Sequence, residues 1–496
     1  MVFLTLSGLV LSSCASLPAS PLQDEAPSEP ESVFNSGTFA GLGLRNLGPA
    51  LMSGRIADIA LHPDDPSTWY VAVGSGNVWK TTNAGTTWKP IFEDQGSYST
   101  GCITIDPNAP DTIWLGTGEN VGGRHVGFGD GVYVSRDGGG SWTNVGLGAS
   151  EHIGKILVDP RDSDTVYAAS QGPLWSGGGE RGLFKSTDGG GAWSLILSGG
   201  PYTGVNDVIM DPEQPDVLYA SKHQRLRTVA ALLNGGPESG IFKSVDGGAT
   251  WSELTRGLPS EDKGRIGLAL APEDSSVVYA TIELGPRKGG FYRSTDSGES
   301  WEKRNDYMSG GTGPHYYQEI WASPHAPGTV FQADVWMNVT RDGGATFNPV
   351  GEANKHSDNH ALAFHPTDPD YLLAGCDGGL YETFDQGATW KFVANLPVTQ
   401  FYKVAVDDAE PFYNVYGGTQ DNSTQGGPSR TDSANGIRNA DWFITVFADG
   451  HQPATEPGNP DIVYSEWQEG NLVRTDRRTG EIVYIQPQPD ENEPWE

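Results

Sequence analysis

One eight-residue pattern recurs along this chain and limits what the chain can fold into. Seven segments match S/T-x-D/N-x-G-x-x-W/F, and successive copies lie about 43 to 58 residues apart. The acid or amide positions of the copies are Asn83, Asp137, Asp188, Asp246, Asp296, Asp342 and Asp385. A repeat of this length matches one four-stranded blade, so the pattern predicts an all-β propeller.

The residue types within the pattern are those of a tight turn. The hydroxyl and carboxylate side chains bond to backbone groups across a hairpin, and the glycine supplies a positive φ. The closing aromatic ring fills the space beneath the turn. Because each acid is used inside its own turn, we expect these seven positions to be structural.

Strand-like runs recur more often than the turn pattern does. Eight β-rich runs, among them 54–63, 99–107 and 358–366, are followed by a weaker ninth unit that begins near Phe443. Nine units exceed the commonest rings of four to eight blades. We expect seven blades over residues 37–395 and two further blades over 396–496. These two would begin a second propeller in a chain truncated at its C-terminus, and one nine- or ten-bladed ring is the alternative.

The N-terminal segment has the features of an export signal. Residues 1–14 are largely apolar, too short to span a bilayer, and end at Cys14. Leu11-Ser12-Ser13-Cys14 looks like a lipobox, which implies cleavage before Cys14 and a lipid on its thiol. Residues 15–36 are rich in Pro, Ser and Glu and predict a flexible tether. We therefore expect an exported lipoprotein, held at the cell surface or in the periplasm only through that lipid.

The charge of the chain narrows the choice of partners. The sequence holds 63 acidic and 31 basic residues, and its formal net charge is −32. Such a surface repels phosphate backbones, so nucleic acid is excluded as a partner.

Several segments resemble known families. GTGEN (116–120), HSDNHALAFHP (356–366), GCDGGLYETFDQGATW (375–390) and YGGTQDNSTQGGPSR (416–430) resemble bacterial secreted proteins described as sortilin-like or glycosyl-hydrolase-like. The repeated cassette is also similar to sortilin-type receptors, whose ten-bladed Asp-box propeller binds peptides. It is similar as well to xyloglucanases, which have two seven-bladed propellers and cleave with a pair of aspartates.

The xyloglucanase resemblance can be followed residue by residue. The position of the first catalytic aspartate corresponds to Gly74, and that of the second corresponds to Asp377. Glycine supplies neither acid nor base, whereas glycoside hydrolysis needs both. Whether the chain is an enzyme therefore stays open, with Asp334, Asp421 and Glu119 as further candidate acids beside Asp377.

In a propeller, the starts of the innermost strands and the turns after the second strands converge around the axis. We call these positions the axial strand ends. Acids, amides and aromatic rings gather there, which is the chemistry of sugar or peptide recognition. The predicted ligand-binding residues are Arg55, Glu119, Tyr316, Tyr317, Trp336, His356, Asp358, His360, Gln420, Asp421, Asn422 and Trp467.

Three of these residues raise the question of a metal. His356, Asp358 and His360 alternate along a segment expected to be extended, so their side chains would share one face. Two imidazoles and a carboxylate could hold a divalent metal ion, and a hydrogen-bonded network without metal is the alternative. We have no firm cofactor prediction beyond this.

The leading hypothesis is a surface lipoprotein whose propeller binds glycan or peptide at the axial strand ends, where the sixth to eighth blades meet. The first alternative is a glycoside hydrolase of the xyloglucanase type. The second is an assembly or scaffold factor, by analogy with a single-propeller Asp-box protein that aids photosystem II assembly. A fold hosts many functions, so the architecture alone does not choose among them.

Overall fold

The computed structural model describes residue 38 and residues 41–52, 54–123, 126–285, 288–307, 316 and 319–488. The chain divides into two compact units, Met1–Asn46 and Leu47–Glu496, and every sheet in the described part belongs to the second. No helix within the described part is long and apolar enough to cross a membrane. Cys14, residues 15–36 and Tyr317 lie outside the described residues, so what the sequence predicts for them stays a prediction.

The first four sheets occupy residues 56–254 and are built from short antiparallel strands. The first two contain β1 (Ile56–Leu61), β2 (Trp69–Val73), β3 (Asn77–Thr81) and β4 (Lys89–Pro90), then β5 (Thr100–Ile105), β6 (Ile113–Thr117), β7 (Val132–Ser135) and β8 (Thr143–Asn144). The third contains β9 (Ile153–Asp159), β10 (Asp162–Ser170), β11 (Gly182–Ser186) and β12 (Ser194–Leu197). The fourth contains β13 (Thr203–Met210), β14 (Leu218–Arg227), β16 (Gly240–Ser244) and β17 (Ser252–Leu254), with β15 (Leu232–Asn234) added on β14.

Five more sheets follow with the same antiparallel order. The fifth and sixth contain β18 (Ile266–Ala271), β19 (Asp274–Gly285), β20 (Lys288–Ser294) and β21 (Glu302–Asn305), then β22 (Ile320–Ala322), β23 (Val330–Gln332), β24 (Asn338–Thr340) and β25 (Asn348–Pro349). The seventh contains β26 (Asn359–Phe364), β27 (Leu372–Cys376), β28 (Gly379–Thr383) and β29 (Lys391–Phe392). The eighth contains β30 (Lys403–Val406), β31 (Asn414–Gly418), β32 (Thr424–Pro428) and β33 (Phe443–Val446), with the 3-10 turn η2 (Asn439–Asp441). The ninth contains β34 (Ala454–Glu456), β35 (Asn459–Trp467), β36 (Asn471–Asp476) and β37 (Glu481–Tyr484), with the 3-10 turn η3 (Gln468–Gly470). The expected all-β propeller architecture with nine blade-like units is confirmed.

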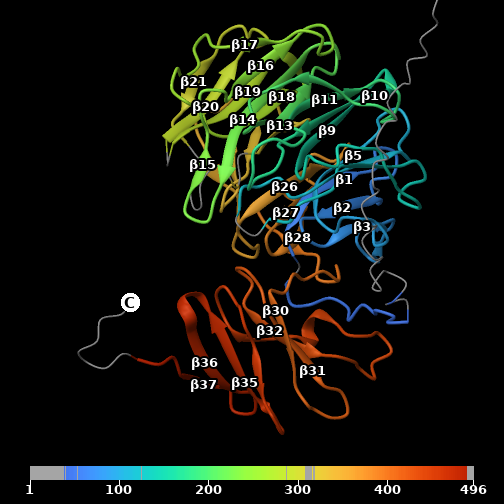
Figure 1. Cartoon of the computed structure of the whole chain (residues 1–496), viewed down its shortest axis with the longest axis vertical. Helices are drawn as coiled ribbons and strands as arrows, with labels where there is room; N and C mark the ends of the chain where they lie inside the picture. The colour runs from blue at the N-terminus through green and yellow to red at the C-terminus, as the bar shows by residue number, and fades with distance from the viewer. Residues whose placement is uncertain are drawn as a thin grey trace, which may run out of the picture. The chain divides into compact units, whose positions relative to one another are not determined.

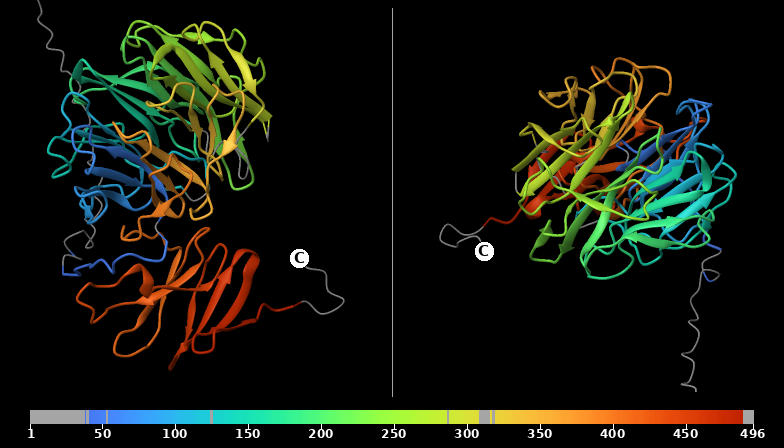
Figure 2. Two further views of the ribbon diagram at one scale, coloured as in Figure 1. Left: turned by 180° about the vertical axis from the view of Figure 1, so that it is seen from behind. Right: turned by 90° about the horizontal axis from the view of Figure 1, so that it is seen from above.

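The first seven sheets close into a ring. Their innermost strands pack in succession from β1 through β5, β9, β13 and β18 to β22, and β26 packs against β1. Figure 1 shows β26–β28 in orange beside β1–β3 in blue, and Figure 2 shows the same neighbourhood from two other sides. The strands β30 and β34 pack on each other and begin two sheets outside this ring. The alternative of one nine- or ten-bladed ring therefore does not hold.

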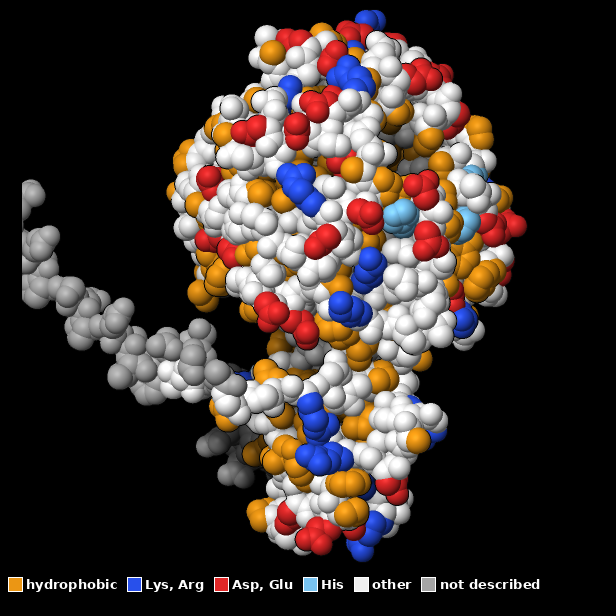
Figure 3. Space-filling model, turned by 90° about the vertical axis from the view of Figure 1, so that its right-hand side faces the viewer, with side chains coloured by type: hydrophobic (Ala, Val, Ile, Leu, Met, Phe, Trp, Pro, Cys, Tyr) orange, Lys and Arg blue, Asp and Glu red, His pale blue; other side chains and the backbone are white. Residues whose placement is uncertain are grey.

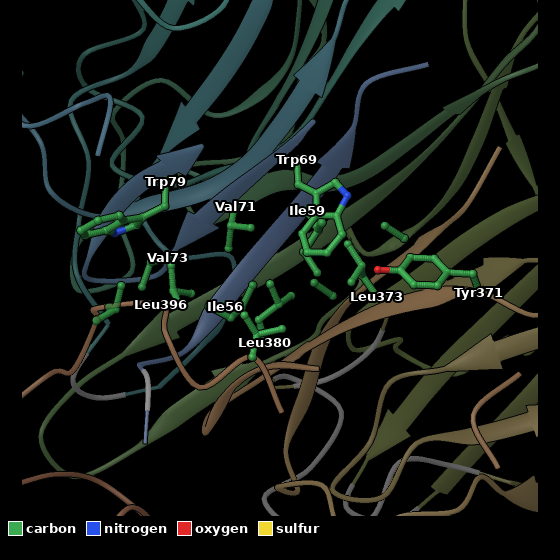
Figure 4. Packing of buried hydrophobic residues seen from close by; sticks show 14 residues of the cluster. Ile56, Ile59, Trp69, Val71, Val73, Trp79, Tyr371, Leu373, Leu380 and Leu396 are labelled. Carbon is green, nitrogen blue, oxygen red and sulfur yellow. The ribbon is translucent and has the colours of Figure 1, made fainter. Parts of the chain in front are cut away.

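The closure between the first and seventh sheets is an apolar contact. Ile56 and Val71 from the first sheet lie in one cluster with Leu373 and Leu380 from the seventh, and all four are fully buried. Figure 4 shows these side chains pointing toward one another. Burying one such side chain contributes about 1.5–3 kcal/mol, so this cluster stabilises the closed ring.

The repeated turns have the geometry that their residue types require. In the fourth copy, Ser244 Oγ accepts from Gly248 N at 2.9 Å and donates to Asp246 Oδ1 at 2.8 Å. Asp246 Oδ1 also accepts from Thr250 N at 2.8 Å, and Gly248 has a φ of +89°. The other six turns repeat these bonds, so each acid or amide is used within its own hairpin.

The surface carries charges of both signs despite the acidic composition. The face drawn in Figure 3 mixes acidic, basic and apolar side chains with the pale backbone and small polar groups.

Candidate functional site

A buried guanidinium joins three sheets at the axial strand ends. Arg55 lies just before β1 and donates from Nε to Asp377 Oδ1 at 2.7 Å and from Nη1 to Glu119 Oε1 at 3.0 Å. Its Nη2 donates to the hydroxyl of Tyr316, whose ring centre lies 5.0 Å from the guanidinium carbon. One cation thus balances two buried carboxylates that come from the second and seventh sheets.

Asp377 is held as an anion by its surroundings. Its Oδ1 lies 2.8 Å from His360 Nε2, and its Oδ2 accepts from the Tyr316 hydroxyl at 3.1 Å. Burial raises the pKa of Asp377, but Arg55 and His360 outweigh it and hold that pKa well below its usual range. A carboxylate in this state cannot supply a proton to a leaving group.

The carboxylate of Glu119 fills the space beside Gly74. A Cβ atom at Gly74 would lie 2.3 Å from Glu119 Oε1, which is closer than real atoms approach. The other oxygen of Glu119 accepts from Gly127 N at 3.0 Å. At the first position that the xyloglucanase resemblance singles out, Gly74, the carboxylate of Glu119 therefore takes up the space. Asp377 stands at the second position, and Arg55 bonds to both acids.

The structure does not bring His356, Asp358 and His360 together as the possible metal group that the sequence suggested. Asp358 has a φ of +65° and β26 begins only at Asn359, so no extended run carries the three side chains to one face. His356 Nδ1 lies 2.9 Å from its neighbour's carbonyl oxygen, and His360 contacts Asp377 instead. Among the described residues, the group that could hold a metal ion is Asp358, Asp377 and Asp421.

A cleft lies where the first, seventh and eighth sheets meet, and we call it the junction cleft. Its lining residues are Met52, Gly54, Arg55, Asp377, Thr399, Gln400, Tyr402, Thr419, Gln420 and Asn422. Asn422 donates from Nδ2 to the main-chain oxygen of Asp377 at 3.0 Å. This cleft brings together four of the predicted ligand-binding or catalytic positions, namely Arg55, Asp377, Gln420 and Asn422.

A second hollow continues from the junction cleft, and we call it the aromatic groove. It is lined by Tyr402, Gln420, Asp449, Gly450, His451, Glu466, Trp467, Gln468, Glu469 and Gly470. Tyr402 and Gln420 line both hollows, and the Tyr402 hydroxyl donates to Gln420 Oε1 at 3.1 Å. The groove therefore combines aromatic rings, amides and carboxylates along one surface.

The remaining candidate acids differ in accessibility. Asp334 is buried and accepts from the hydroxyl of Tyr307 and from Val335 N. Asp421 is exposed, and its partial desolvation together with the carboxyl group of Asp449 raises its pKa to about 7. Trp336 is exposed and lines neither of the two hollows described above.

Two residues of the groove, Asp449 and His451, are not among the positions predicted from the repeat. Both lie between β33 and β34, where the repeat is too weak to mark the strand ends. The segment Asp449-Gly450-His451 was the available signal, because an acid and an imidazole around a glycine follow directly on a strand-like run.

Known proteins share both sequence and fold with this chain. The family model for sortilin, neurotensin receptor 3, matches residues 289–439. An oligoxyloglucan-reducing end-specific xyloglucanase of Emericella nidulans is 22% identical over 491 residues, which is 89% of this chain and 54% of that protein. A xyloglucanase of a Paenibacillus species is 25% identical over 292 residues, which is 57% of this chain and 24% of that protein. The chain spans about half the length of the fungal relatives it matches.

Solved structures agree with the fold. The GH74 enzyme of Niastella koreensis superposes with a TM-score of 0.62 at 18% identity, covering 89% of this chain and 67% of that one. The GH74 xyloglucanase of Xanthomonas campestris gives 0.57 at 14% identity, covering 90% and 75%. The chain is thus an Asp-box propeller protein, related to the sortilin-type and xyloglucanase-type proteins that its repeats resemble.

Proposed function

We propose that this protein is a glycoside hydrolase that binds a polysaccharide in the aromatic groove. The observation that carries the proposal is the composition of the groove. Tyr402 and Trp467 offer ring faces, while Asp449 and Glu466 offer carboxylates along the same hollow. Aromatic faces stack on sugar rings, and hydrolysis of a glycosidic bond requires a pair of carboxyl groups.

The chemistry follows from the positions of these groups. The amides of Gln420 and Gln468 can bond to sugar hydroxyls while the rings of Tyr402 and Trp467 hold the chain. One carboxyl group then protonates the departing oxygen, and the other activates water or attacks the anomeric carbon. The names of the relatives support a polysaccharide as the ligand, since they are xyloglucanases.

A glycan-binding protein without hydrolysis is the second candidate. The observation that favours it is the state of the central acids, because Arg55 pairs with both Glu119 and Asp377. Of these two acids, Asp377 is held as a carboxylate and so has no proton to give to a leaving group.

A polysaccharide panel that includes xyloglucan tests both candidates. Binding is measured by calorimetry and cleavage by the release of reducing ends. Trp467→Ala should abolish binding, whereas Trp175→Ala, which removes an exposed tryptophan outside the groove, should leave it unchanged. Glu466→Gln and Asp449→Asn should keep binding and lose cleavage.

Three results would count against the hydrolase. Binding without any product release supports the second candidate. Unchanged binding in Trp467→Ala would mean that the ligand binds outside the aromatic groove. No binding to any polysaccharide overturns both candidates.

We also propose that the protein is exported and anchored through a lipid on Cys14. The support is the Leu11-Ser12-Ser13-Cys14 segment after an apolar run. Cys14→Ser should move the protein from the membrane fraction to the soluble fraction. An unmodified Cys14 in the N-terminal peptide by mass spectrometry would contradict the anchor.

A further inference from the structure

Three aspartates from separate turns converge beside the junction cleft. Asp358 precedes β26, Asp377 lies between β27 and β28, and Asp421 lies between β31 and β32. One carboxylate oxygen from each lies within 4.8 Å of the others. Two oxygens bound to one Ca²⁺ ion at about 2.4 Å are at most about 4.8 Å apart, so the spacing suits a single ion.

Several carboxylates gather around this cluster. Arg55 contacts it and is shared between Asp377 and Glu119, and His360 also contacts Asp377. Asp358 and Asp421 add two further carboxylates, and Asp449 lies against the same turn because its Oδ1 accepts from Asp421 N at 2.6 Å. Like charges this close repel one another unless a proton or a cation compensates them.

A buried amide oxygen in the same place has no partner. Asn422 follows Asp421, lines the junction cleft with Asp377, and is only 6% exposed. Its Nδ2 is committed to the Asp377 carbonyl oxygen, which fixes the orientation of the amide. Its Oδ1 is buried without a hydrogen-bond partner among the described residues. An orphaned buried acceptor of this kind is destabilising unless a ligand satisfies it.

We propose that Asp358, Asp377 and Asp421, together with Asn422 Oδ1, bind a divalent cation, and that this cation is Ca²⁺. All four donors are hard oxygen atoms, three from carboxylates and one from an amide, which is the ligand set that Ca²⁺ prefers. Mg²⁺ requires a near-octahedral shell at about 2.1 Å and usually keeps several of its waters, whereas Ca²⁺ accepts many protein oxygens in a flexible geometry, so a set of three carboxylates and an amide favours Ca²⁺.

The cation has a structural consequence at the ring. Asp358 and Asp377 belong to the seventh sheet, and Asp421 and Asn422 belong to the eighth. An ion held by both sheets ties the last blade of the ring to the blade that follows it. It also lies beside Gln420, at the end of the aromatic groove, and so fixes one wall of that groove. Binding of the ion requires only these donors and does not depend on hydrolysis.

Calorimetry on the full chain after EDTA treatment tests this inference. CaCl₂ should bind to the wild type with one site and more tightly than MgCl₂. Asp421→Asn and Asn422→Ala should each weaken Ca²⁺ binding by at least about tenfold. Asp432→Asn removes an exposed acid from the loop between β32 and β33 and should bind Ca²⁺ like the wild type.

Thermal unfolding separates a lost ligand from a damaged fold. Without Ca²⁺, Asp421→Asn should melt no lower than the wild type, because the substitution relieves repulsion with Asp449. With Ca²⁺, only the wild type and Asp432→Asn should melt higher. If Asp421→Asn does not fold, Asn422→Ala carries the test. Absence of Ca²⁺ binding to the wild type, or full binding to the folded cluster variants, overturns the proposal.

Discussion

Two sets of acids in this molecule share a residue type and differ in their surroundings. The acids of the repeated turns, which we call box acids, are exposed or half-exposed and bond within their own hairpins. Bonds within the turn lower the pKa of Asp246 to about 2. The acids near or just after the ends of the second strands, which we call strand-end acids, are Glu119, Glu283, Asp334, Asp377 and Asp421. Four of these five are buried, and Glu283 has a pKa raised to about 7.

The difference lies in how far apart the partners are in sequence. Asp246 bonds to Ser244 and Thr250, two and four residues away. Arg55 reaches across 64 residues to Glu119 and across 322 residues to Asp377. A local motif thus determines the state of a box acid, whereas the closed ring determines the state of a strand-end acid.

Removing the cation shared by two strand-end acids should have the largest effect. Arg55→Met leaves Glu119 and Asp377 buried without their partner and should cost about 3–5 kcal/mol in the free energy of unfolding. Arg161→Met breaks ion pairs of a half-exposed arginine and should cost no more than about 1 kcal/mol. Chemical denaturation of the two variants measures these losses in the free energy of unfolding. Equal losses would contradict the difference between buried and exposed ion pairs.

The second largest difference between strand-end acids and box acids should appear in the pH dependence of stability. Burial raises the pKa of Glu283 from 4.5 to about 7. Folding therefore favours the protonated form of Glu283. The contribution of this preference to the free energy of unfolding is complete below about pH 4.5 and is lost as pH rises through 7. Glu283→Gln should gain stability relative to the wild type between pH 5 and pH 8, by roughly 3 kcal/mol at most.

A box acid should show the opposite sign. The lowered pKa of Asp137, about 2, reflects bonds from Ser141 and Ser135. Its contribution is present above about pH 4 and is lost as pH falls toward 2. Melting curves of Asp137→Asn and Glu283→Gln across this range check both signs, and parallel curves for the two variants would contradict the distinction.

A side chain added at Gly74 should disturb the contacts of the strand-end acids and lower the free energy of unfolding by a smaller amount. Gly74→Asp places new atoms against the Glu119 carboxylate and should destabilise the fold by about 1–3 kcal/mol. Adding Glu119→Gly vacates that space and leaves Arg55 an acid to pair with, so the double variant should recover at least about half of the loss. Additive losses in urea denaturation would show that the two positions do not share the space.

The smallest effect should come from a single repeated turn. Ser244→Ala removes the acceptor for Gly248 N and should cost about 1 kcal/mol. Polysaccharide and Ca²⁺ binding should be unchanged, because this turn belongs to the fourth sheet, whereas the junction cleft lies where the first, seventh and eighth sheets meet. Ser276→Ala, at a half-buried position near the start of β19 and outside the seven boxes, is the control for thermal unfolding. Loss of binding in Ser244→Ala would place the box acids in the site.

The repeat carries most of the fold, and the site depends on contacts that the repeat does not encode. The spacing of the turns predicts the sheets, and the position of each acid within its unit marks the strand ends. It does not reveal that Arg55 would meet Asp377, since seven blades must close before the two touch. The strand alternation expected through His356 and His360 fails because Asp358 adopts a left-handed conformation. Asp449 was not predicted as a site residue, because the ninth unit departs from the repeat.

The apolar seam between β1 and β26 determines how the chain acquires its fold over time. Ile56 is among the first core residues to leave the ribosome, and Leu373 of the same cluster follows more than three hundred residues later. At ordinary rates of synthesis this interval is on the order of tens of seconds. Throughout it, the face of β1 that later meets β26 stays open to water and to other chains. Such late, long-range closure slows folding and leaves an apolar strand edge open to aggregation until the seventh blade arrives.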